Sequence, residues 1–302
     1  MQFVHNFDTL MSLLRADGTC ARVAVAAPHD AHTLEAVDAA RRAGLAHFIL
    51  IGDPAKITAA PGPDVEIVAE ADTDRAAALA VKMAREGRAD VIMKGLLNTD
   101  NLLRAVLNRE TGIMPRGKVL THLTAAEIPG RHKLLMLSDV AVIPNPTPEQ
   151  HEAITAMLAE HCHALGIENP RIALVHFNEK TTPKFPVTEG YARIRQLASE
   201  GHFGKVTVDG PMDVKTALDP EAGPAKGIFS PIEGDADALV FPDIEAGNTF
   251  YKTISWLSHS TNAGVVTGAD VPVVVPSRGD TSRSKLCSLA LACLCARRKA
   301  NN

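Results

Sequence analysis

The sequence predicts an α/β fold: parallel or mixed β-sheets flanked by helices, in two domains, with the second domain inserted into the first. Short runs rich in β-branched residues alternate with longer stretches whose apolar residues recur at helical spacing, which is typical of βαβ units. The length of 302 residues allows two domains at roughly 100–200 residues each. A segment with three prolines, residues 144–148, interrupts the alternation and marks the expected crossing.

The first half of the chain has the clearest alternation. Strands are predicted where Val, Ile, Leu and Ala run together, and helices where apolar residues follow a 3.6-residue period. In order, the expected elements are strand 22–27, helix 33–43, strand 48–51, strand 65–69, helix 74–86, strand 90–93, a helix beginning at Thr99, and strands 119–122 and 134–137.

Beyond the prolines the alternation restarts with a helix that Thr147 caps and that has Pro148 in its first turn. The expected elements that follow are strand 171–177, helix 188–199, strands 205–208 and 238–241, helix 248–257, strands 264–267 and 271–275, and helix 281–298. The last helix is apolar nearly all round over residues 286–296, so we expect it to be buried against the first half. This places the first domain at residues 1–143 and 266–302, and the inserted domain at 144–265.

Composition excludes several classes of function. Hydrophobic residues make up 46% and charged residues 22%, and the formal net charge is −4, so there is no basic excess for a nucleic-acid backbone. Aromatic residues are only 4%, which argues against single-stranded nucleic-acid and carbohydrate binding by stacking. Apolar runs are shorter than the ~20 residues of a membrane span, and the N-terminal residues do not resemble a secretory signal. We therefore expect a cytoplasmic protein that binds neither membranes nor nucleic acids.

Cysteine and histidine spacing predicts no metal site. The five cysteines form no CxxC pair, and their odd number does not suggest a disulfide framework, so we interpret them as small buried hydrophobic residues in a reducing compartment. His161 and His163 are too closely spaced to bind one metal ion from one helical face. The sequence also contains no P-loop, dinucleotide-binding glycine motif, GxSxG or HExxH motif.

The segment from Pro276 to Lys285 is the strongest candidate for a functional site. It joins a predicted strand to the N-terminus of a helix, where free N–H groups and a partial positive charge favour anions. Ser277 and Arg278 could add to a phosphate pocket there, and Arg283 and Lys285 bring further positive charge. Asp280 fits such a pocket only if it binds a proton or serves as a base. The alternative is a cationic, capped helix start on the surface.

Other strand ends carry weaker candidates. Lys94 ends a predicted buried strand, and Gly95 after it allows a close backbone approach, although an exposed lysine beside a glycine turn has the same pattern. Asp243 and Glu245 could act as acids, bases or metal ligands, but carboxylates at helix N-termini are also ordinary stabilisers. The segment 208–213 has the same strand-end position without a cation.

Read in order, these segments resemble blocks of the phosphate acetyltransferase/phosphate butyryltransferase family. The resemblance covers about residues 20–298 and is closest to the butyryltransferase branch, or to the acetyltransferase half of fused enoyl-CoA hydratase/phosphate acetyltransferase proteins. The blocks are Lys94 to Thr99, Ser138-Asp139 leading to residues 144–150, Glu179-Lys180 with Pro183-Lys184, residues 208–212, residues 242–248, and Ser277 to Asp280.

The resemblance implies a two-domain α/β fold with the active site in the interdomain cleft, and a homodimer or higher homo-oligomer. It implies the reaction of a short-chain acyl-CoA with phosphate to give acyl phosphate and CoA, by direct transfer in a ternary complex without a metal or cofactor. Arg278 would hold the phosphate, Ser277 would hydrogen-bond the thiol or carbonyl group, and Asp280 would be the base for the CoA thiol. In acetyl-transferring members the acidic residue lies seven positions after the serine, where this chain has Ser284.

Further contacts to phosphate or CoA are expected from residues on the matching motifs at strand ends. The candidates are Lys94, Gly95, Asn98, Asn248 and Arg283.

Two other functions remain open from the sequence. The chain could be a non-catalytic acyl-CoA-binding or dimerisation module of the same family, although the intact Ser277-Arg278 pair favours an enzyme. A metal-dependent decarboxylating dehydrogenase of similar architecture would need clustered Asp ligands and a cofactor loop, which the sequence does not show. The sequence does not distinguish acetyl from butyryl transfer, because one methylene group in a pocket is worth only about 1–3 kcal/mol.

Overall fold

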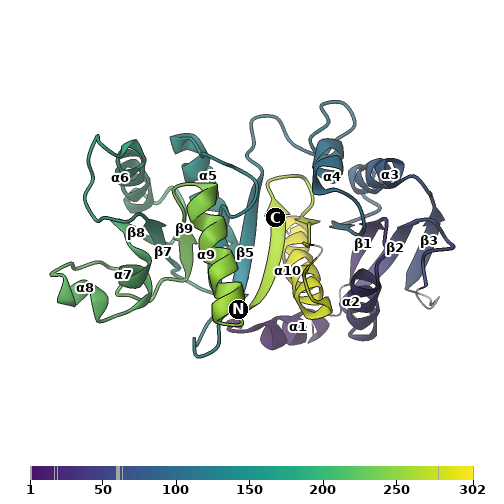
Figure 1. Ribbon diagram of the computed structural model, residues 1–302, viewed down its shortest axis with the longest axis horizontal. Coiled ribbons are helices and arrows are strands. Elements are labelled where there is room, and N and C mark those ends of the chain that lie inside the picture. The colour runs from purple at the N-terminus through teal and green to yellow at the C-terminus, as the bar shows by residue number, and fades with distance from the viewer. Residues whose placement is uncertain are drawn as a thin grey trace. The chain divides into compact units, whose positions relative to one another are not determined.

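Strands and helices alternate along the chain as the sequence predicts (Figure 1). The structure is a computed structural model. It describes residues 2–16, 18, 20–58, 62, 64–277 and 279–301, with side chains as far as Arg297. The chain forms two compact units. The flanking unit comprises Phe7–Leu120 and the chain from Thr261 onward. The inserted unit comprises Thr121–Ser260 together with the N-terminal residues up to Asn6.

The flanking unit is built around a mixed sheet in the order β3-β2-β1-β4-β11-β10. Every neighbouring pair is parallel except β10 and β11, which are antiparallel. The elements of this unit are α1 (Phe7–Ala16), β1 (Ala21–Ala26), α2 (Ala31–Arg42), β2 (Ala46–Gly52), β3 (Val65–Ala69), α3 (Thr73–Arg85), β4 (Val91–Lys94), α4 (Thr99–Val106), β10 (Thr261–Thr267), β11 (Val273–Val274) and α10 (Ser282–Asn301).

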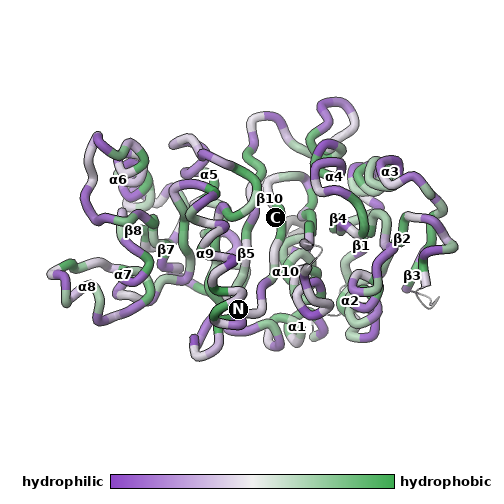
Figure 2. The backbone as a smooth tube through the Cα atoms, viewed as in Figure 1, coloured by the Kyte–Doolittle hydropathy of each residue, from purple (hydrophilic) through white to green (hydrophobic). Residues whose placement is uncertain are grey.

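Helices cover this sheet from both sides. α10 packs against α1 and α2, while α3 packs against α4, and both groups also contact the strands. The central strands β1 and β4 are almost entirely buried, and Figure 2 shows the hydrophobic stretches of β1 and β2. The middle of α10 is buried from Leu289 to Leu294, as its apolar sequence predicts.

The strands of the inserted unit follow the order β5-β6-β9-β7-β8. β5 and β6 are antiparallel, and the other neighbouring pairs are parallel. The elements of this unit are β5 (Thr121–Glu127), β6 (Leu135–Ser138), α5 (Pro148–Ala164), β7 (Arg171–Val175), α6 (Pro186–Ser199), β8 (Thr207–Met212), α7 (Val214–Leu218), α8 (Ala222–Ala225), β9 (Ala238–Val240) and α9 (Ile244–Leu257).

Alternate strand residues of this sheet face two helical layers. Leu135, Leu137 and Leu239 belong to a core that also includes residues of α7 and α9. α5 packs against β6, β7 and β9 and against α6, which contacts β8. The capping expected at the start of α5 is present: the side chain of Thr147 accepts a hydrogen bond from the N–H of Gln150, and Pro148 is the first helical residue.

The structure departs from the predicted elements in several places. β5 and β6 form an antiparallel hairpin instead of continuing the parallel series, because residues 128–134 are too few for a parallel crossover. β8 continues through Pro211, which an edge strand tolerates, whereas the expected strand stops at residue 208. α1, α7 and α8 are additional helices.

The predicted domains were residues 1–143 with 266–302, and residues 144–265. The boundaries between the two compact units fall at other points of the chain. Residues 121–143 group with the inserted unit, because β5 pairs with β6 and β6 pairs with β9. Residues 261–265 group with the flanking unit as part of β10.

Within the described part of the chain, no helix combines the length and the hydropathy that a bilayer crossing requires.

Candidate active site

The carboxyl ends of β4 and β11 form one edge of the flanking unit's sheet. The two strands are parallel neighbours, with Val273 opposite Ile92 and Val274 opposite Met93. The segments that follow them therefore meet at that edge, where ligands of open α/β sheets commonly bind. These segments are Lys94 to Thr99 and Pro276 to Thr281, two of the candidates from the sequence.

Lys94 is the last residue of β4 and is only 4% exposed. Its Nζ donates hydrogen bonds to the carbonyl oxygen of Leu97 at 3.1 Å and to that of Gly95 at 3.4 Å. The alternative of an exposed lysine beside a glycine turn is therefore wrong. The amino group of Lys94 therefore lies buried at the strand end, where it donates to backbone carbonyl oxygens.

Gly95 allows the close backbone approach that its position predicts, and the approaching segment is the backbone at Ala26 and Ala27. A Cβ atom at Gly95 would lie 2.2 Å from the carbonyl oxygen of Ala27, which follows β1. The N–H of Gly95 donates to the carbonyl oxygen of Ala26 at 2.8 Å, and the N–H of Leu96 donates to that of Ala27 at 2.7 Å. Gly95 thus fixes the path of the segment between Lys94 and α4.

A cavity of about 300 Å³ opens at this edge. It brings together three of the predicted site residues, Lys94, Asn98 and Ser277. Asn98 is the N-cap residue of α4, but its side chain makes no capping hydrogen bond to that helix. The described lining consists of Lys94, Leu97, Asn98, Thr99, Pro276 and Ser277.

Leu97, Thr99 and Pro276 lie inside the candidate segments named from the sequence, although they were not named individually as site residues. Their position directly after predicted strands was the available signal, because parallel neighbours place such segments together. A buried ammonium group, a helix N-terminus and a hydroxyl group beside one cavity form a suitable environment for an anion.

Asp280 shapes the turn that carries Ser277. Its Oδ2 accepts a hydrogen bond from the N–H of Ser277 at 2.8 Å, and its own N–H donates to the carbonyl oxygen of Ser277 at 3.1 Å. The N–H of Gly279 lies 3.4 Å from Oγ of Ser277. Arg278, the predicted phosphate-binding residue, lies outside the described residues.

The cations at the start of α10 are paired with carboxylates of the same unit. Thr281 caps the helix, since its Oγ1 accepts from the N–H of Ser284 at 3.1 Å. Arg283 donates through Nη2 to Asp8 at 2.7 Å. Arg283 is not among the described residues that line the cavity, so its predicted contact to phosphate or CoA stays a prediction.

Lys285 is buried and its Nζ donates to Oδ1 of Asp30 at 2.9 Å. Burial acts to raise the pKa of Asp30, but hydrogen bonds from Thr33 and Lys285 outweigh it and hold this pKa below its usual value. Lys285 therefore joins α10 to the start of α2.

Comparison with known proteins identifies the family. The family model described as phosphate acetyl/butaryl transferase matches residues 59–293. Phosphate butyryltransferase of Clostridium acetobutylicum is 40% identical over 286 residues, covering 92% of this chain and 94% of that protein. Phosphate acetyltransferase of Rhizobium meliloti is 36% identical over 299 residues, covering 97% of this chain and 94% of that protein.

A solved structure agrees with these relatives. The crystal structure of a branched-chain phosphotransacylase from Enterococcus faecalis V583 matches with a TM-score of 0.82 at 29% identity, covering 91% of this chain and 99% of that chain. The chain belongs to the phosphate acetyl/butaryl transferase family. The resemblance recognised from the motifs is thereby confirmed.

Asn248 has a framework role in this member of the phosphate acetyl/butaryl transferase family. It lies in α9 of the inserted unit, and its Nδ2 donates to the carbonyl oxygen of Val140 at 2.8 Å. A Cβ atom at the neighbouring Gly247 would lie 2.1 Å from the carbonyl oxygen of Asp139. Asp243 caps α9 by accepting from the N–H of Ala246 at 2.8 Å, which is the ordinary stabilising role considered for it.

The carboxylate of Asp139 is the centre of the same framework. It is buried, and its Oδ1 accepts from the N–H groups of Ala141 at 2.7 Å and Val142 at 2.8 Å. Its Oδ2 accepts from Oγ1 of Thr121 at 2.6 Å and from the N–H of His122 at 3.2 Å. Ser138 and Asp139 belong to one of the family-like blocks, and these contacts show that the block organises the end of β6.

Two other family-like blocks meet at the carboxyl ends of β7 and β8. Nζ of Lys226 contacts Oε1 of Glu179 at 2.9 Å, Oγ1 of Thr216 at 3.2 Å and the carboxylate of Asp213. Burial acts to raise the pKa of Asp213, but the hydrogen bonds with Lys226, with the N–H of Thr216 and with Glu179 together outweigh it, and the pKa is lowered to about 2. Asp213 also caps α7 by accepting from the N–H of Thr216 at 2.8 Å.

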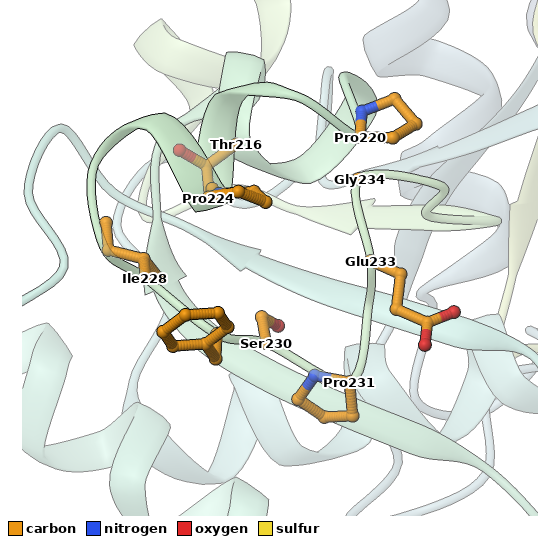
Figure 3. Close-up of a pocket in the computed structure, with 10 residues that line it drawn as sticks. Thr216, Pro220, Pro224, Ile228, Ser230, Pro231, Glu233 and Gly234 are labelled. Carbon is orange, nitrogen blue, oxygen red and sulfur yellow. The ribbon is translucent and has the colours of Figure 1, made fainter.

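An open pocket of about 510 Å³ lies beside this cluster (Figure 3). Pro224, Ile228 and Phe229 contribute to its apolar wall, while Thr216 and Ser230 add hydroxyl groups. Both hydroxyl groups have protein partners, since Oγ of Ser230 donates to Asp209 at 2.6 Å and Oγ1 of Thr216 contacts Asp213 at 3.3 Å.

The described residues contain no cluster of His, Cys, Asp and Glu side chains arranged to hold a metal ion. Nδ1 of His161 contacts the carbonyl oxygen of Met157 at 2.6 Å, and Nδ1 of His163 contacts that of Ile167 at 2.9 Å. Both rings are therefore engaged with nearby backbone.

Proposed function

We propose that the protein is a phosphate acyltransferase that converts a short-chain acyl-CoA and inorganic phosphate into acyl phosphate and CoA. The observation that carries this proposal is the cavity at β4 and β11, where Lys94, Asn98 and Ser277 meet beside the N-terminus of α4. The family supports the reaction type, since relatives of the chain are named phosphate butyryltransferase and phosphate acetyltransferase.

The proposed chemistry is direct transfer between two bound substrates. An oxygen of hydrogen phosphate attacks the thioester carbonyl carbon, the carbon–sulfur bond breaks, and the CoA thiolate leaves and takes up, by way of Asp280, the proton that the phosphate gives up. Lys94 and the N-terminus of α4 offset the charge of phosphate. Ser277 donates a hydrogen bond to the sulfur or carbonyl oxygen.

The remaining predicted residues have assigned parts in this proposal. Arg278 holds the phosphate, and Asp280 accepts the thiol proton when acyl phosphate is consumed. Arg283 and Asn248 contribute to substrate binding, Arg283 directly and Asn248 through the backbone at Val140 that it holds. The transfer is proposed to need no metal or cofactor, so activity is expected to persist in a chelating buffer.

The decisive experiment is phosphorolysis of acyl-CoA by the purified protein, followed as release of free thiol. We expect phosphate-dependent turnover of at least one substrate in a series from acetyl-CoA to hexanoyl-CoA. The ratio of kcat/KM along the series then defines the preferred acyl chain. Tight binding of acyl-CoA without turnover of any member would instead indicate a binding module.

A serine substitution tests the cavity itself. Ser277→Ala is expected to lower kcat by about 10²–10³, the effect of removing one hydrogen bond that strengthens in the transition state. Ser199→Ala is the matched control, because Oγ of Ser199 is exposed and bonds only the nearby backbone at Gln196. Equal activity of both variants would remove Ser277 from the mechanism.

The cellular setting is part of the proposal. We infer a cytoplasmic homodimer or higher homo-oligomer, with acyl-CoA and phosphate as its small-molecule partners. Light scattering coupled to gel filtration measures the oligomeric state, and a monomer at micromolar concentration would contradict this part.

A further inference from the structure

The four residues between β1 and α2, residues 27–30, are linked to both segments that border the cavity at β4 and β11. On one side, the carbonyl oxygen of Ala27 accepts a hydrogen bond from the N–H of Leu96, in the segment after β4, at 2.7 Å. On the other side, the carboxylate of Asp30 accepts from Nζ of Lys285 in α10, the helix that follows the second segment. The junction between β1 and α2 therefore connects the two sides of the cavity.

Lys285 makes a buried link to this junction. Its side chain is only 4% exposed, and its Nζ donates to Oδ1 of Asp30 at 2.9 Å and to Oγ1 of Thr33 at 3.0 Å. Oδ1 of Asp30 also accepts from the N–H of Thr33 at 2.9 Å, which caps α2. Because a hydrogen bond between charged groups is short and strong, the pair fixes the first turn of α10 against the start of α2.

Two other contacts at the start of α10 are more exposed. Ser282 donates to Glu35 of α2, and Arg283 pairs with Asp8 of α1. The side chains of Glu35 and Asp8 are 61% and 78% exposed. Contacts of this kind contribute little to stability, because solvent screens the charges and the side chains lose entropy when they are held. The position of the helix start therefore depends mainly on Lys285.

The start of α10 in turn determines where Ser277 lies. Oδ2 of Asp280 accepts from the N–H of Ser277 at 2.8 Å, and Thr281 caps the helix by accepting from the N–H of Ser284 at 3.1 Å. The turn that carries Ser277 is therefore attached closely to the helix. A shift of α10 would displace Ser277, whereas Lys94 on the other side of the cavity belongs to β4 and keeps its own support.

We propose that Lys285 is a positioning residue for acyl transfer: by binding Asp30, it holds Ser277 in the place that the reaction requires. This inference rests on the proposed function, because it concerns the same cavity. Lys285 is not among the described residues that line the cavity, so it acts through the turn of Ser277. A displacement of about 1 Å in an active site can cost about 100-fold in rate, so loss of the link lowers kcat.

Steady-state kinetics of Lys285→Met test the proposal at a temperature where the variant and the unmodified protein are both folded. We expect kcat to fall at least tenfold and the KM for phosphate to change less than twofold, because Lys94 and the N-terminus of α4 stay in place. A purely structural role would lower the unfolding temperature and leave kcat of the folded protein unchanged.

Hydrogen–deuterium exchange gives a second readout that needs no turnover. The N–H groups of Ser277 and Asp280 are both hydrogen-bonded within the turn, and they should exchange faster in Lys285→Met than in the unmodified protein. Absence of turnover by the unmodified protein would contradict the proposed function. A normal kcat or unchanged exchange of the turn in Lys285→Met would contradict the positioning role instead.

Arg22→Met is the matched control, because it breaks an ion pair at the opposite end of β1. Arg22 contacts Asp90, which directly precedes β4, at 2.7 Å. This variant should lower the unfolding temperature, keep kcat within twofold and leave exchange of the Ser277 turn unchanged. An equal loss of kcat in Arg22→Met would overturn the proposal, because the effect of Lys285→Met would then reflect general loosening of the unit.

A double variant keeps the test decisive if Lys285→Met fails to fold. Removal of one partner of a buried pair leaves the other charge uncompensated, whereas removal of both charges is far better tolerated. Lys285→Met combined with Asp30→Asn removes both charges and keeps a side-chain oxygen for the N-cap of α2. We expect it to fold with kcat reduced at least tenfold, and full kcat in this folded double variant would overturn the proposal.

Discussion

The carboxylate of Asp280 has a positioning contact with Ser277 and a proposed role as a base, and a suitable substitution can distinguish the two. Its Oδ2 holds the N–H of Ser277, so the side chain has a defined positioning contact in addition to its proposed role as a base. Both roles use the same group within one turn. Only a replacement that keeps the acceptor and removes the basicity distinguishes them.

We predict that Asp280→Asn keeps the turn and lowers kcat at least 100-fold for consumption of acyl phosphate and CoA, because the amide oxygen still accepts from Ser277 but cannot take a proton. Asp280→Ala should lose the activity and also reduce thermal stability. Steady-state kinetics and thermal unfolding measure the two effects. Full activity of Asp280→Asn would leave this residue with the positioning role alone.

Asp213 provides a pH test that is independent of activity. Its pKa of about 2 is below its ordinary value of 3.8, so its ionised form stabilises the native state above about pH 4, and this contribution is lost as pH falls toward 2. Because the side chain of Asp213 is 26% exposed and that of its partner Lys226 is 40% exposed, solvent screens the pair, and we expect a contribution of about 1 kcal/mol or less. Asn at this position keeps an oxygen for the N-cap of α7.

The expected result is therefore a difference in the free energy of unfolding between the unmodified protein and Asp213→Asn that is present at pH 6 and shrinks as pH approaches 2. Urea unfolding at a series of pH values measures it, and carboxylates that do not contact Asp213 or Lys226 cancel in the difference. A difference that is constant with pH would show that the contact with Lys226 is not electrostatic in origin.

At the scale of elements, the junction between β4 and α4 depends on the absence of a side chain at Gly95. Gly95→Ala is predicted to destabilise the protein by about 2–4 kcal/mol or to prevent folding, because the new methyl group would overlap the carbonyl oxygen of Ala27. Gly190→Ala is the matched control. Gly190 lies within α6, and a Cβ atom there would be at an ordinary distance of 3.7 Å from the side chain of Pro148. Because alanine favours a helix more than glycine does, we expect this variant to stabilise the protein by about 0.5–1 kcal/mol. Chemical denaturation compares the two, and equal effects would contradict the proposed steric role.

Most elements could be predicted from the sequence because their signals are local. β3 has the predicted bounds, and Thr147 and Asp243 cap helices in the way that their residue types favour. The β5–β6 hairpin was missed because the direction of a strand depends on which strand it pairs with, and a local hydrophobic pattern does not reveal the pairing. α1 was missed although Phe7, Leu10, Met11 and Leu14 have helical spacing, so in that case the signal was present.

The candidate site was predictable in part, because some of its signals are also local in the sequence. Lys94 and Ser277 were found because they follow apolar strands, but the pairing of β4 with β11 joins residues 92 and 273, which no local pattern reveals. The surface role considered for Lys94 was wrong because its burial is set by that pairing. The ion pair between Arg283 and Asp8 likewise joins residues far apart in sequence.

At the scale of the whole molecule, the cysteines are expected to divide into two classes. Cys162, Cys287 and Cys293 are buried, and burial raises the pKa of the Cys293 thiol to about 12 and also raises that of Cys162. At pH 8 almost no thiolate forms at these two positions. Cys20 and Cys295 are only partly buried.

We therefore predict that a chromogenic disulfide reagent labels at most two of the five thiols quickly in the native protein at pH 8 and all five in guanidinium chloride. Cys293→Ser should leave the fast count unchanged. Rapid native labelling of more than two thiols would show that α5, which holds Cys162, or α10, which holds Cys287 and Cys293, opens readily.

The position of β11 and α10 in the flanking unit has a consequence for synthesis on the ribosome. β11 lies between β4 and β10, and α10 packs against α1 and α2, so residues made last complete a sheet whose other strands are made first. The segment Thr121–Ser260 is translated in full before that completion. The inserted unit can therefore fold while the nascent flanking unit still lacks two strands and a helix, which leaves β4 and the apolar face of α2 uncovered until β11 and α10 have been made.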